Sequence, residues 1–192
     1  AKDKDVVVVG GGDTAMDCVR TAVRQGAKSV KCLYRRNRDN MPGSLREVEH
    51  AEEEGVEFVW LAAPEAFLGN GHVNGVRTQR MRLGAPDADG RRVPEPVGDG
   101  PFTIPADMVI KALGFDAEDL PGMFGCPDLA LSQEGTLAVD EETMMTSLDG
   151  VFAAGDIVRG ASLVVWAILD GRNAATHIDA YIRAVERDGK AA

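Results

Sequence analysis

Hydrophobic residues form one continuous run near the start of the chain and recur at regular spacing after it. The valines at 6–9 are typical of a strand buried on both faces, as in a parallel sheet covered on each side by other elements. Apolar positions then follow helical spacing over 14–25, and Gly26 is placed to end that helix. A strand, a helix that begins with capping-box spacing, and a further strand are predicted at 30–34, 44–54 and 56–61. The series predicts an α/β fold with a parallel sheet.

The middle of the chain changes character. Turn-forming dipeptides separate short extended pieces there, which predicts an antiparallel β-meander inserted before another strand of the parallel sheet. The dipeptides are Asn70-Gly71, Asn74-Gly75 and Asp89-Gly90, and the extended pieces include 76–83 and 91–97. The following strand is predicted to be buried and to cover 108–112, before Gly114.

The last part of the chain contains two short strand-like pieces and one long helix. Strands are predicted at 136–139 and 151–154, and a helix at 162–185. The first turns of that helix, 163–169, are apolar on every side. We expect them to be buried in a core larger than the end of this chain can supply.

Composition excludes several classes of protein. The chain has 192 residues, a net charge of −10 and a hydrophobic fraction of 44 %, which is ordinary for a globular protein. The acidic balance argues against a nucleic acid as a partner, because such binding relies largely on Lys and Arg. No stretch approaches the roughly 20 apolar residues that span a bilayer. We therefore expect no membrane association and a cytoplasmic location.

The cysteines limit the redox chemistry of the chain. Cys18, Cys32 and Cys126 stand far apart and form no C-x-x-C pair, so no disulfide framework, metal site or iron–sulfur cluster is predicted. Any redox chemistry must therefore use an organic cofactor.

A glycine-rich turn lies between the first strand and the first helix. It fits the pattern G-x-G-x-x-A and comprises Gly10, Gly11, Gly12, Asp13, Thr14 and Ala15. In this position the first glycine permits a tight turn, the second lets the backbone approach a pyrophosphate, and Ala15 lets the helix pack closely. The helix amides then face the phosphates. We interpret Asp13 as the helix cap, with its carboxylate turned away from the pyrophosphate.

The end of the second strand indicates which dinucleotide is bound. Folds selective for NAD place an acidic residue there, about 20 residues after the glycines, whereas this chain has Arg35 and Arg36. A carboxylate would repel the 2′-phosphate of NADPH, and two guanidinium groups can bind it. The pattern favours NADPH, although a run of solvated surface arginines is the alternative.

A third signal is the pair Gly155 and Asp156, between the last strand-like piece and an apolar helix. An aspartate in this position can accept hydrogen bonds from a polyol, while the helix dipole stabilises an anionic ring. Alternatively, Asp156 merely caps the helix.

Together these motifs resemble the small subunits of bacterial NADPH-dependent glutamate synthases. The resemblance is carried by the segments 10–20, 34–36, 40–47, 151–157 and 171–175. It implies the flavoprotein fold with two dinucleotide-binding domains found in glutathione-reductase-type enzymes, in which the NADPH domain interrupts the FAD domain. It implies that residues 1–115 form a Rossmann-like NADPH-binding domain and that 116–192 form the C-terminal portion of an FAD-binding domain.

The resemblance also implies roles for single residues. Ala112, Leu113 and Gly114 are implied to line the nicotinamide side of NADPH. Gly155 and Asp156 are implied to meet the ribityl chain and phosphate of FAD, and Val164 the pyrimidine end of its ring. No catalytic side chain is assigned, because hydride transfer needs stacked rings more than acid or base groups.

Parts of the family pattern are absent from the sequence. The chain lacks the first FAD fingerprint, the cysteines of the iron–sulfur clusters and a glutamine amidotransferase module. We therefore expect it to be the C-terminal part of the subunit, to retain no FAD and to be inactive alone. In the full-length protein the resemblance implies hydride transfer from NADPH to FAD. Electrons then pass through iron–sulfur clusters to a large (alpha) subunit, for glutamate synthesis from glutamine and 2-oxoglutarate.

Two other functions remain open at this point. One is a related NADPH-dependent flavoprotein subunit with another acceptor, of the dihydropyrimidine dehydrogenase, sulfide dehydrogenase or transhydrogenase type. The other is a non-catalytic NADPH-binding module, for which 163–169 would be a partner surface. In any of these cases we expect the C-terminal piece to be mobile or to be buried in a homodimer contact.

Overall fold

The computed structural model describes residues 1–86, 90 and 92–189. It divides the chain into two compact units, Ala1–Gly114 and Phe115–Ala192. The division falls beside the boundary predicted after residue 115. The assignment of the first unit to NADPH and of the second to FAD stays a prediction.

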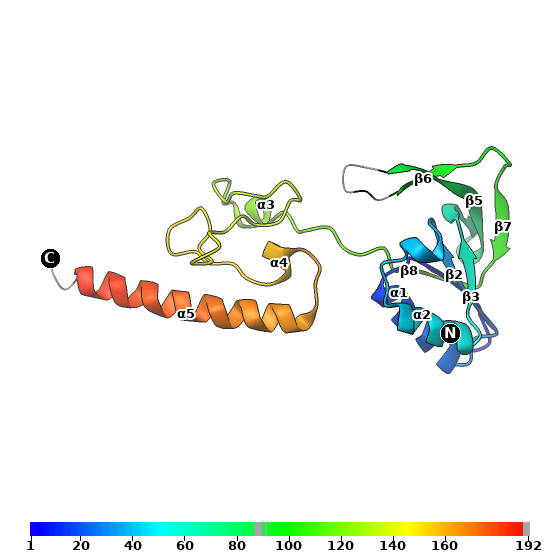
Figure 1. Ribbon diagram of the computed structural model, residues 1–192, viewed down its shortest axis with the longest axis horizontal. Helices are drawn as coiled ribbons and strands as arrows, with labels where there is room; N and C mark the ends of the chain where they lie inside the picture. The colour runs from blue at the N-terminus through cyan, green and yellow to red at the C-terminus, as the bar shows by residue number, and fades with distance from the viewer. Residues whose placement is uncertain (87–89, 91, 190–192) are drawn as a thin grey trace. The chain divides into compact units, whose positions relative to one another are not determined.

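A four-stranded parallel sheet forms the centre of the first unit (Figure 1). The strands lie in the order β3-β2-β1-β8 and are β1 (Asp5–Val9), β2 (Ser29–Tyr34), β3 (Glu57–Trp60) and β8 (Met108–Lys111). The elements between the first three strands are α1 (Asp13–Arg24), η1 (Arg38–Asn40) and α2 (Leu45–Glu53). The predicted α/β fold with a parallel sheet is confirmed. The prediction of a buried strand at 108–112 is wrong in one respect: β8 is an edge strand and is only partly buried, because it has one neighbour.

The valine run explains how the sheet is covered on both faces. Since side chains alternate along a strand, Val6 and Val8 pack against α1 and α2, and Val7 and Val9 pack on the opposite face. There they meet residues of an antiparallel sheet, including Val76 and Ile104. A helical layer and a second sheet therefore enclose the parallel sheet.

The antiparallel sheet is the predicted meander. Its strands are β4 (Ala62–Gly69), β5 (Val73–Pro86), β6 (Arg92–Pro96) and β7 (Phe102–Pro105), and β5 pairs with each of the other three. Two predicted positions lie outside the described residues. They are residue 89 of the turn dipeptide Asp89-Gly90 and residue 91 of the extended piece 91–97.

Leu61 connects the two sheets. It has a left-handed backbone with φ of 51°, which is uncommon for a non-glycine residue. Its N–H donates to the carbonyl oxygen of Arg36 at 3.1 Å, and its own carbonyl accepts from the N–H of Met81 at 2.7 Å. The segment after β2 is thereby attached to β5.

The second unit contains three helices, α3 (Leu120–Phe124), α4 (Asp156–Arg159) and α5 (Val164–Gly189), within its described residues. The predicted strands at 136–139 and 151–154 are wrong. Residues of these pieces form only isolated bridges, Leu131 with Leu137, Val139 with Thr146 and Met145 with Phe152. Each piece meets a partner at single residues, so no ladder of hydrogen bonds can form.

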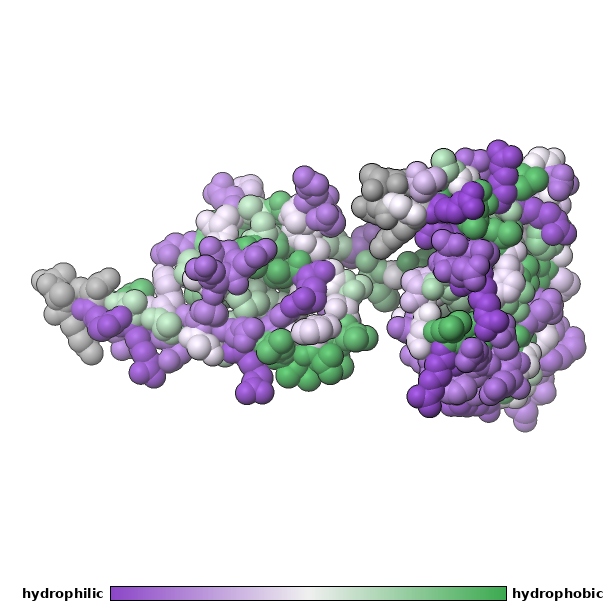
Figure 2. All heavy atoms as spheres, in the orientation of Figure 1, coloured by the Kyte–Doolittle hydropathy of each residue, from purple (hydrophilic) through white to green (hydrophobic). Residues whose placement is uncertain are grey.

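The start of α5 is exposed in this chain. Leu163, Val164, Val165 and Ile168 are each more than half exposed. Figure 2 shows a hydrophobic patch where α5 begins in the second unit. The sequence predicts burial of this segment in a larger core, and that burial is not seen among the described residues. No helix among the described residues is both long and apolar enough to span a membrane.

Candidate dinucleotide site

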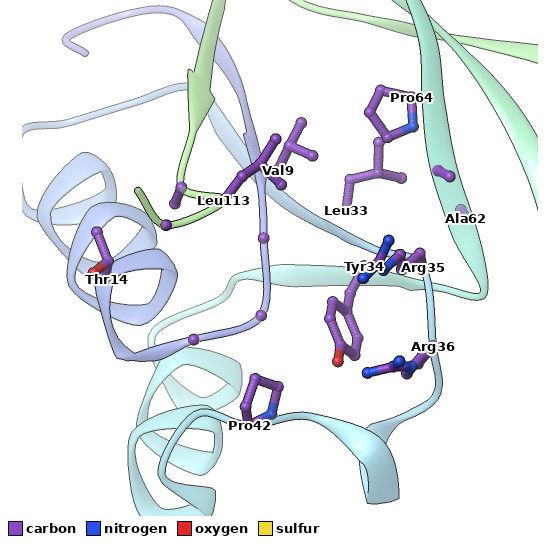
Figure 3. A pocket seen from close by; sticks show the side chains of 16 residues that line it. Val9, Thr14, Leu33, Tyr34, Arg35, Arg36, Pro42, Ala62, Pro64 and Leu113 are labelled. Carbon is purple, nitrogen blue, oxygen red and sulfur yellow. The ribbon is translucent and has the colours of Figure 1, made fainter. Parts of the chain in front are cut away.

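A pocket of about 630 Å³ lies at the carboxyl ends of β1 and β2 in the first unit (Figure 3). Ligands of open α/β sheets bind at such strand ends. The pocket brings together nine residues predicted from the sequence: Gly10, Gly11, Gly12, Thr14, Arg35, Arg36, Ala112, Leu113 and Gly114. Asp13 and Ala15, predicted with them, do not line it.

The three glycines have different surroundings. Gly10 has φ of 148°, and a Cβ there would lie 2.2 Å from the carbonyl oxygen of Ala112. A Cβ on Gly11 would lie 2.4 Å from the ring of Tyr34, whereas one on Gly12 would meet no described atom within 4 Å. The predicted tight turn is present at Gly10, and Gly12 faces open space. Ala15 is fully buried in the helix–sheet core, which fits its predicted close packing.

The amides of the turn are available to an anion. The N–H groups of Gly11, Gly12, Asp13 and Thr14 donate no hydrogen bond to another described residue. They stand at the N-terminus of α1, where the helix dipole adds partial positive charge. Free amides beside an open glycine fit a pyrophosphate.

Asp13 does not cap its own helix, so that prediction is wrong. The N-cap residue of α1 is Gly12, and Asp13 is the first residue inside the helix. Its Oδ1 instead accepts a hydrogen bond of 2.8 Å from the backbone N–H of Ser44, the N-cap residue of α2. The carboxylate is thus held by a backbone amide, as predicted, but by one from the next helix.

The capping box predicted at the start of α2 is also absent. Ser44 makes no capping bond with its side chain. Its own N–H is already bound by Asp13, and the Glu47 carboxylate forms an ion pair with Arg20 of α1. A pairing between helices therefore replaces the pairing within one helix.

The segment between η1 and α2 packs against the glycine turn. The N–H of Gly43 donates to the carbonyl oxygen of Gly11 at 2.9 Å. The hydroxyl of Tyr34 donates to the carbonyl oxygen of Asn40 at 2.8 Å. Pro42 lines the pocket beside this ring (Figure 3). Neither Tyr34 nor Pro42 was predicted to line the pocket, although both lie within segments that carry the family resemblance.

The two arginines after β2 differ in how they are held. The Arg36 side chain is partly buried, and its Nε donates to the carbonyl oxygen of Arg92 at 3.1 Å. Arg35 is exposed, and its guanidinium makes no hydrogen bond or ion pair with a described residue. Arg38, four residues after β2, pairs with Glu52 at 3.1 Å on the surface. Both arginines line the pocket, and their role in binding an anion stays a prediction.

The opposite end of the pocket is apolar. Ala112 follows β8, and its N–H donates to the carbonyl oxygen of Val9 at 2.8 Å. Leu113 is exposed at this end, and Gly114 has φ of 88°. The apolar walls are completed by Val9, Leu33, Ala62, Ala63 and Pro64. An apolar cleft with a few convergent polar groups is the usual form of a cofactor pocket.

In the second unit the structure separates the residues predicted for FAD. Gly155, with φ of 79°, is the N-cap of α4. Asp156 is the first residue inside that helix, so it is not the cap. It lines a hollow of about 400 Å³ together with Asp116, Glu118 and Glu134. These carboxylates suit the hydroxyl groups of a polyol better than a phosphate. Val164 is 71 % exposed and does not line the hollow.

An ion pair that the sequence analysis missed holds the Gly155 turn. Arg159 binds both oxygens of Asp170, with Nη2 to Oδ1 at 2.6 Å and Nε to Oδ2 at 3.0 Å. The bond from Arg159 holds the pKa of the nearly buried Asp170 below its usual value, and the Gly155 amide acts in the same direction. The signal was an acidic residue directly after the apolar segment 163–169, since a buried carboxylate needs a partner.

Residues 1–171 match the family of pyridine nucleotide-disulphide oxidoreductases, and the chain belongs to that family. It is 66 % identical over 184 residues to the glutamate synthase [NADPH] small chain of Azospirillum brasilense, with 96 % of this chain and 38 % of that protein covered. The predicted resemblance to glutamate synthase small subunits is thus confirmed. The chain spans well under half the length of that relative.

A relative with another name shares the same region. The chain is 46 % identical over 181 residues to the NADP(+)-dependent formate dehydrogenase subunit beta of Moorella thermoacetica, which covers 94 % of this chain and 25 % of that protein. Among solved structures, thioredoxin reductase of Lactococcus lactis has a TM-score of 0.77 at 20 % identity, with 95 % of this chain and 54 % of that one covered. This likeness shows the shared fold.

Proposed function

We propose that this chain binds NADPH in the pocket of the first unit and presents its nicotinamide for hydride transfer to FAD. The observation that carries the proposal is that one pocket joins free helix amides, two available arginines and an apolar end. The amides of the glycine turn bind the pyrophosphate. Arg35 and Arg36 bind the 2′-phosphate, and Ala112, Leu113 and Gly114 lie beside the nicotinamide.

The residues of the chain act on binding and orientation. NADPH supplies the hydride and FAD, when bound, accepts it; the protein determines how the rings meet. The apolar walls offer the nicotinamide ring a surface to pack against. In the second unit, the Asp156 carboxylate accepts hydrogen bonds from the ribityl hydroxyls, and the pair of Arg159 with Asp170 keeps the preceding turn in place. We therefore assign 1–115 to NADPH and 116–192 to the C-terminal portion of the FAD domain.

For the whole protein we propose the role of a glutamate synthase small subunit. Electrons from FAD then pass through iron–sulfur clusters outside this chain to a large subunit, which makes glutamate from glutamine and 2-oxoglutarate. The support is the 66 % identity to a glutamate synthase small chain over nearly all of this chain.

Calorimetric titration of the chain with NADPH and NADH tests the coenzyme proposal. A charge-assisted hydrogen bond contributes about 1.5–3 kcal/mol, so NADPH is expected to bind roughly 10- to 100-fold more tightly than NADH. Arg35→Asp removes this preference, because a carboxylate repels the 2′-phosphate. Arg38→Ala is the matched control, since Arg38 already pairs with Glu52. Equal affinity of the wild-type chain for both coenzymes would refute the proposal.

We propose that the chain alone does not retain FAD and is inactive in hydride transfer to it. Val164 and its neighbours at the start of α5 are exposed, so the described residues leave one side of a flavin ring uncovered. Purified chain mixed with FAD and then desalted is expected to show no flavin absorbance. A retained stoichiometric flavin would contradict this.

A related subunit with another electron acceptor is the second candidate function. It is favoured by the 46 % identity to a formate dehydrogenase subunit, a protein named for a different reaction. Dihydropyrimidine dehydrogenase, sulfide dehydrogenase and transhydrogenase types belong to the same alternative. The gene beside the one for this chain separates the candidates: a gene for a glutamate synthase large subunit supports the first, and a gene for another reductase supports the second.

A further inference from the structure

Besides β4, whose first residues line the coenzyme pocket, the antiparallel sheet contacts a pocket residue through β6. Arg36, which lines the pocket, donates from Nε to the carbonyl oxygen of Arg92 at the start of β6. Its own carbonyl oxygen accepts from Leu61, which is in turn bonded to β5. Hydrogen bonds therefore hold both the main chain and the side chain of Arg36. The guanidinium of Arg35 makes no hydrogen bond with a described residue.

Arg92 is itself fixed within the hairpin of β5 and β6. Its Nε donates to the carbonyl oxygen of Gly84 on β5 at 3.1 Å. A continuous series of hydrogen bonds therefore runs from Gly84 through Arg92 to Arg36. The guanidinium of Arg36 has five N–H donors, and the bond from Nε fixes its plane while leaving the donors of both Nη atoms. Figure 3 shows this group turned towards the Tyr34 side of the pocket.

We propose that β6 is part of the coenzyme site and that Arg92 is a positioning residue for selectivity towards NADPH. The inference rests on the proposed function and deepens it. Arg92 orients the Arg36 guanidinium before NADPH binds, so that Arg36 meets the 2′-phosphate with little loss of side-chain freedom. Arg35 closes on the same phosphate only after binding.

The expected size of the effect follows from the ordering of one long side chain. Immobilising such a side chain on binding weakens affinity by roughly two- to tenfold, and preorganisation removes that loss. NADH lacks the 2′-phosphate and does not use Arg36, so its affinity is independent of this restraint.

The test is a double-mutant cycle read out by calorimetric titration with NADPH and NADH. Arg92→Ala removes the side-chain hydrogen bond to Gly84. The backbone carbonyl oxygen of residue 92, which accepts from Arg36, is then held less firmly. We expect the Kd for NADPH to rise about three- to tenfold and the Kd for NADH to stay unchanged. In the Arg36→Ala background, Arg92→Ala is expected to have no further effect. Arg82→Ala is the matched control, because Arg82 pairs with Glu95 in the same hairpin.

Three results would overturn the inference: an unchanged Kd for NADPH in Arg92→Ala, an equal loss for both coenzymes, or a loss that persists without Arg36. The last would show that Arg92 touches the phosphate directly. If the alanine variant fails to fold, Arg92→Met replaces it, since methionine keeps a long unbranched side chain but has no N–H donor for the Gly84 carbonyl oxygen, and the same rise is expected. A wild-type chain without preference for NADPH would instead refute the proposed function.

Discussion

Two glycines of the turn, Gly10 and Gly12, should respond differently to replacement by alanine. In Gly12→Ala, the added methyl group meets no described atom, and the backbone at φ −89° and ψ 179° is open to alanine. In Gly10→Ala, the methyl group lies 2.2 Å from the carbonyl oxygen of Ala112, at a φ of 148° that disfavours alanine. Gly12→Ala is therefore expected to affect the binding of a ligand, and Gly10→Ala to affect the stability of the fold.

The magnitudes can be worked from these surroundings. Replacing glycine by alanine at an N-cap loses about 1 kcal/mol at most, while the smaller entropy of the unfolded chain returns about 0.4–1 kcal/mol. Gly12→Ala should therefore leave the free energy of unfolding nearly unchanged. For Gly10→Ala, backbone strain and overpacking of 1–3 kcal/mol each predict a loss of about 3 kcal/mol or more. For a chain of this size that lowers Tm by roughly 10 °C.

Thermal unfolding and NADPH titration of both variants check the prediction. The methyl group of Gly12→Ala displaces the pyrophosphate from the free amides, and the loss of one such bond weakens binding by roughly 10- to 100-fold. The stable variant should thus be the one that loses its ligand. Tight NADPH binding by Gly12→Ala would show that the phosphates do not lie against this glycine. It would refute the proposal that the amides of the glycine turn bind the pyrophosphate.

Further predictions concern other residues of the first unit. The bond from Arg20 lowers the pKa of Glu54 from its ordinary 4.5, so its contribution to stability is full above that pH and is lost as pH falls through the lowered value. The decline of Tm in acid should be shallower in Glu54→Gln. Burial raises the pKa of Cys32 to about 12, so a thiol reagent at pH 8 should modify it only after unfolding, as peptide mapping can show. Asp13→Ala frees the Ser44 amide and should weaken NADPH binding by loosening the segment that packs on the glycine turn; Asp13→Asn, which keeps an acceptor oxygen, should restore it.

Local patterns were sufficient to predict the centre of the first unit. The valine run at 6–9 alternates between two cores, and the glycine turn and the arginines lie where parallel strands end. These features depend on neighbours in sequence or on the geometry common to all parallel sheets. This reasoning predicted six of the residues that line the pocket, and the family resemblance implied the other three, Ala112, Leu113 and Gly114.

Features set by distant partners could not be predicted in this way. The acceptor for the Ser44 amide is Asp13, 31 residues earlier, and the acceptor for Arg36 is 56 residues later. The pieces at 136–139 and 151–154 have strand-like composition, but no continuous partner strand is present among the described residues. Composition can indicate that a segment is able to pair, whereas the partner depends on the tertiary fold.

All the residues that line the dinucleotide pocket precede Phe115, where the second compact unit begins. If this pocket binds the coenzyme as proposed, coenzyme choice is encoded in one contiguous stretch of the gene, separate from the segments that receive the electrons. Such a stretch can be exchanged between genes as a whole, and its arginines can be altered to accept another nucleotide without redesigning the remainder. Proteins named for unrelated reactions can in this way share one coenzyme-binding unit.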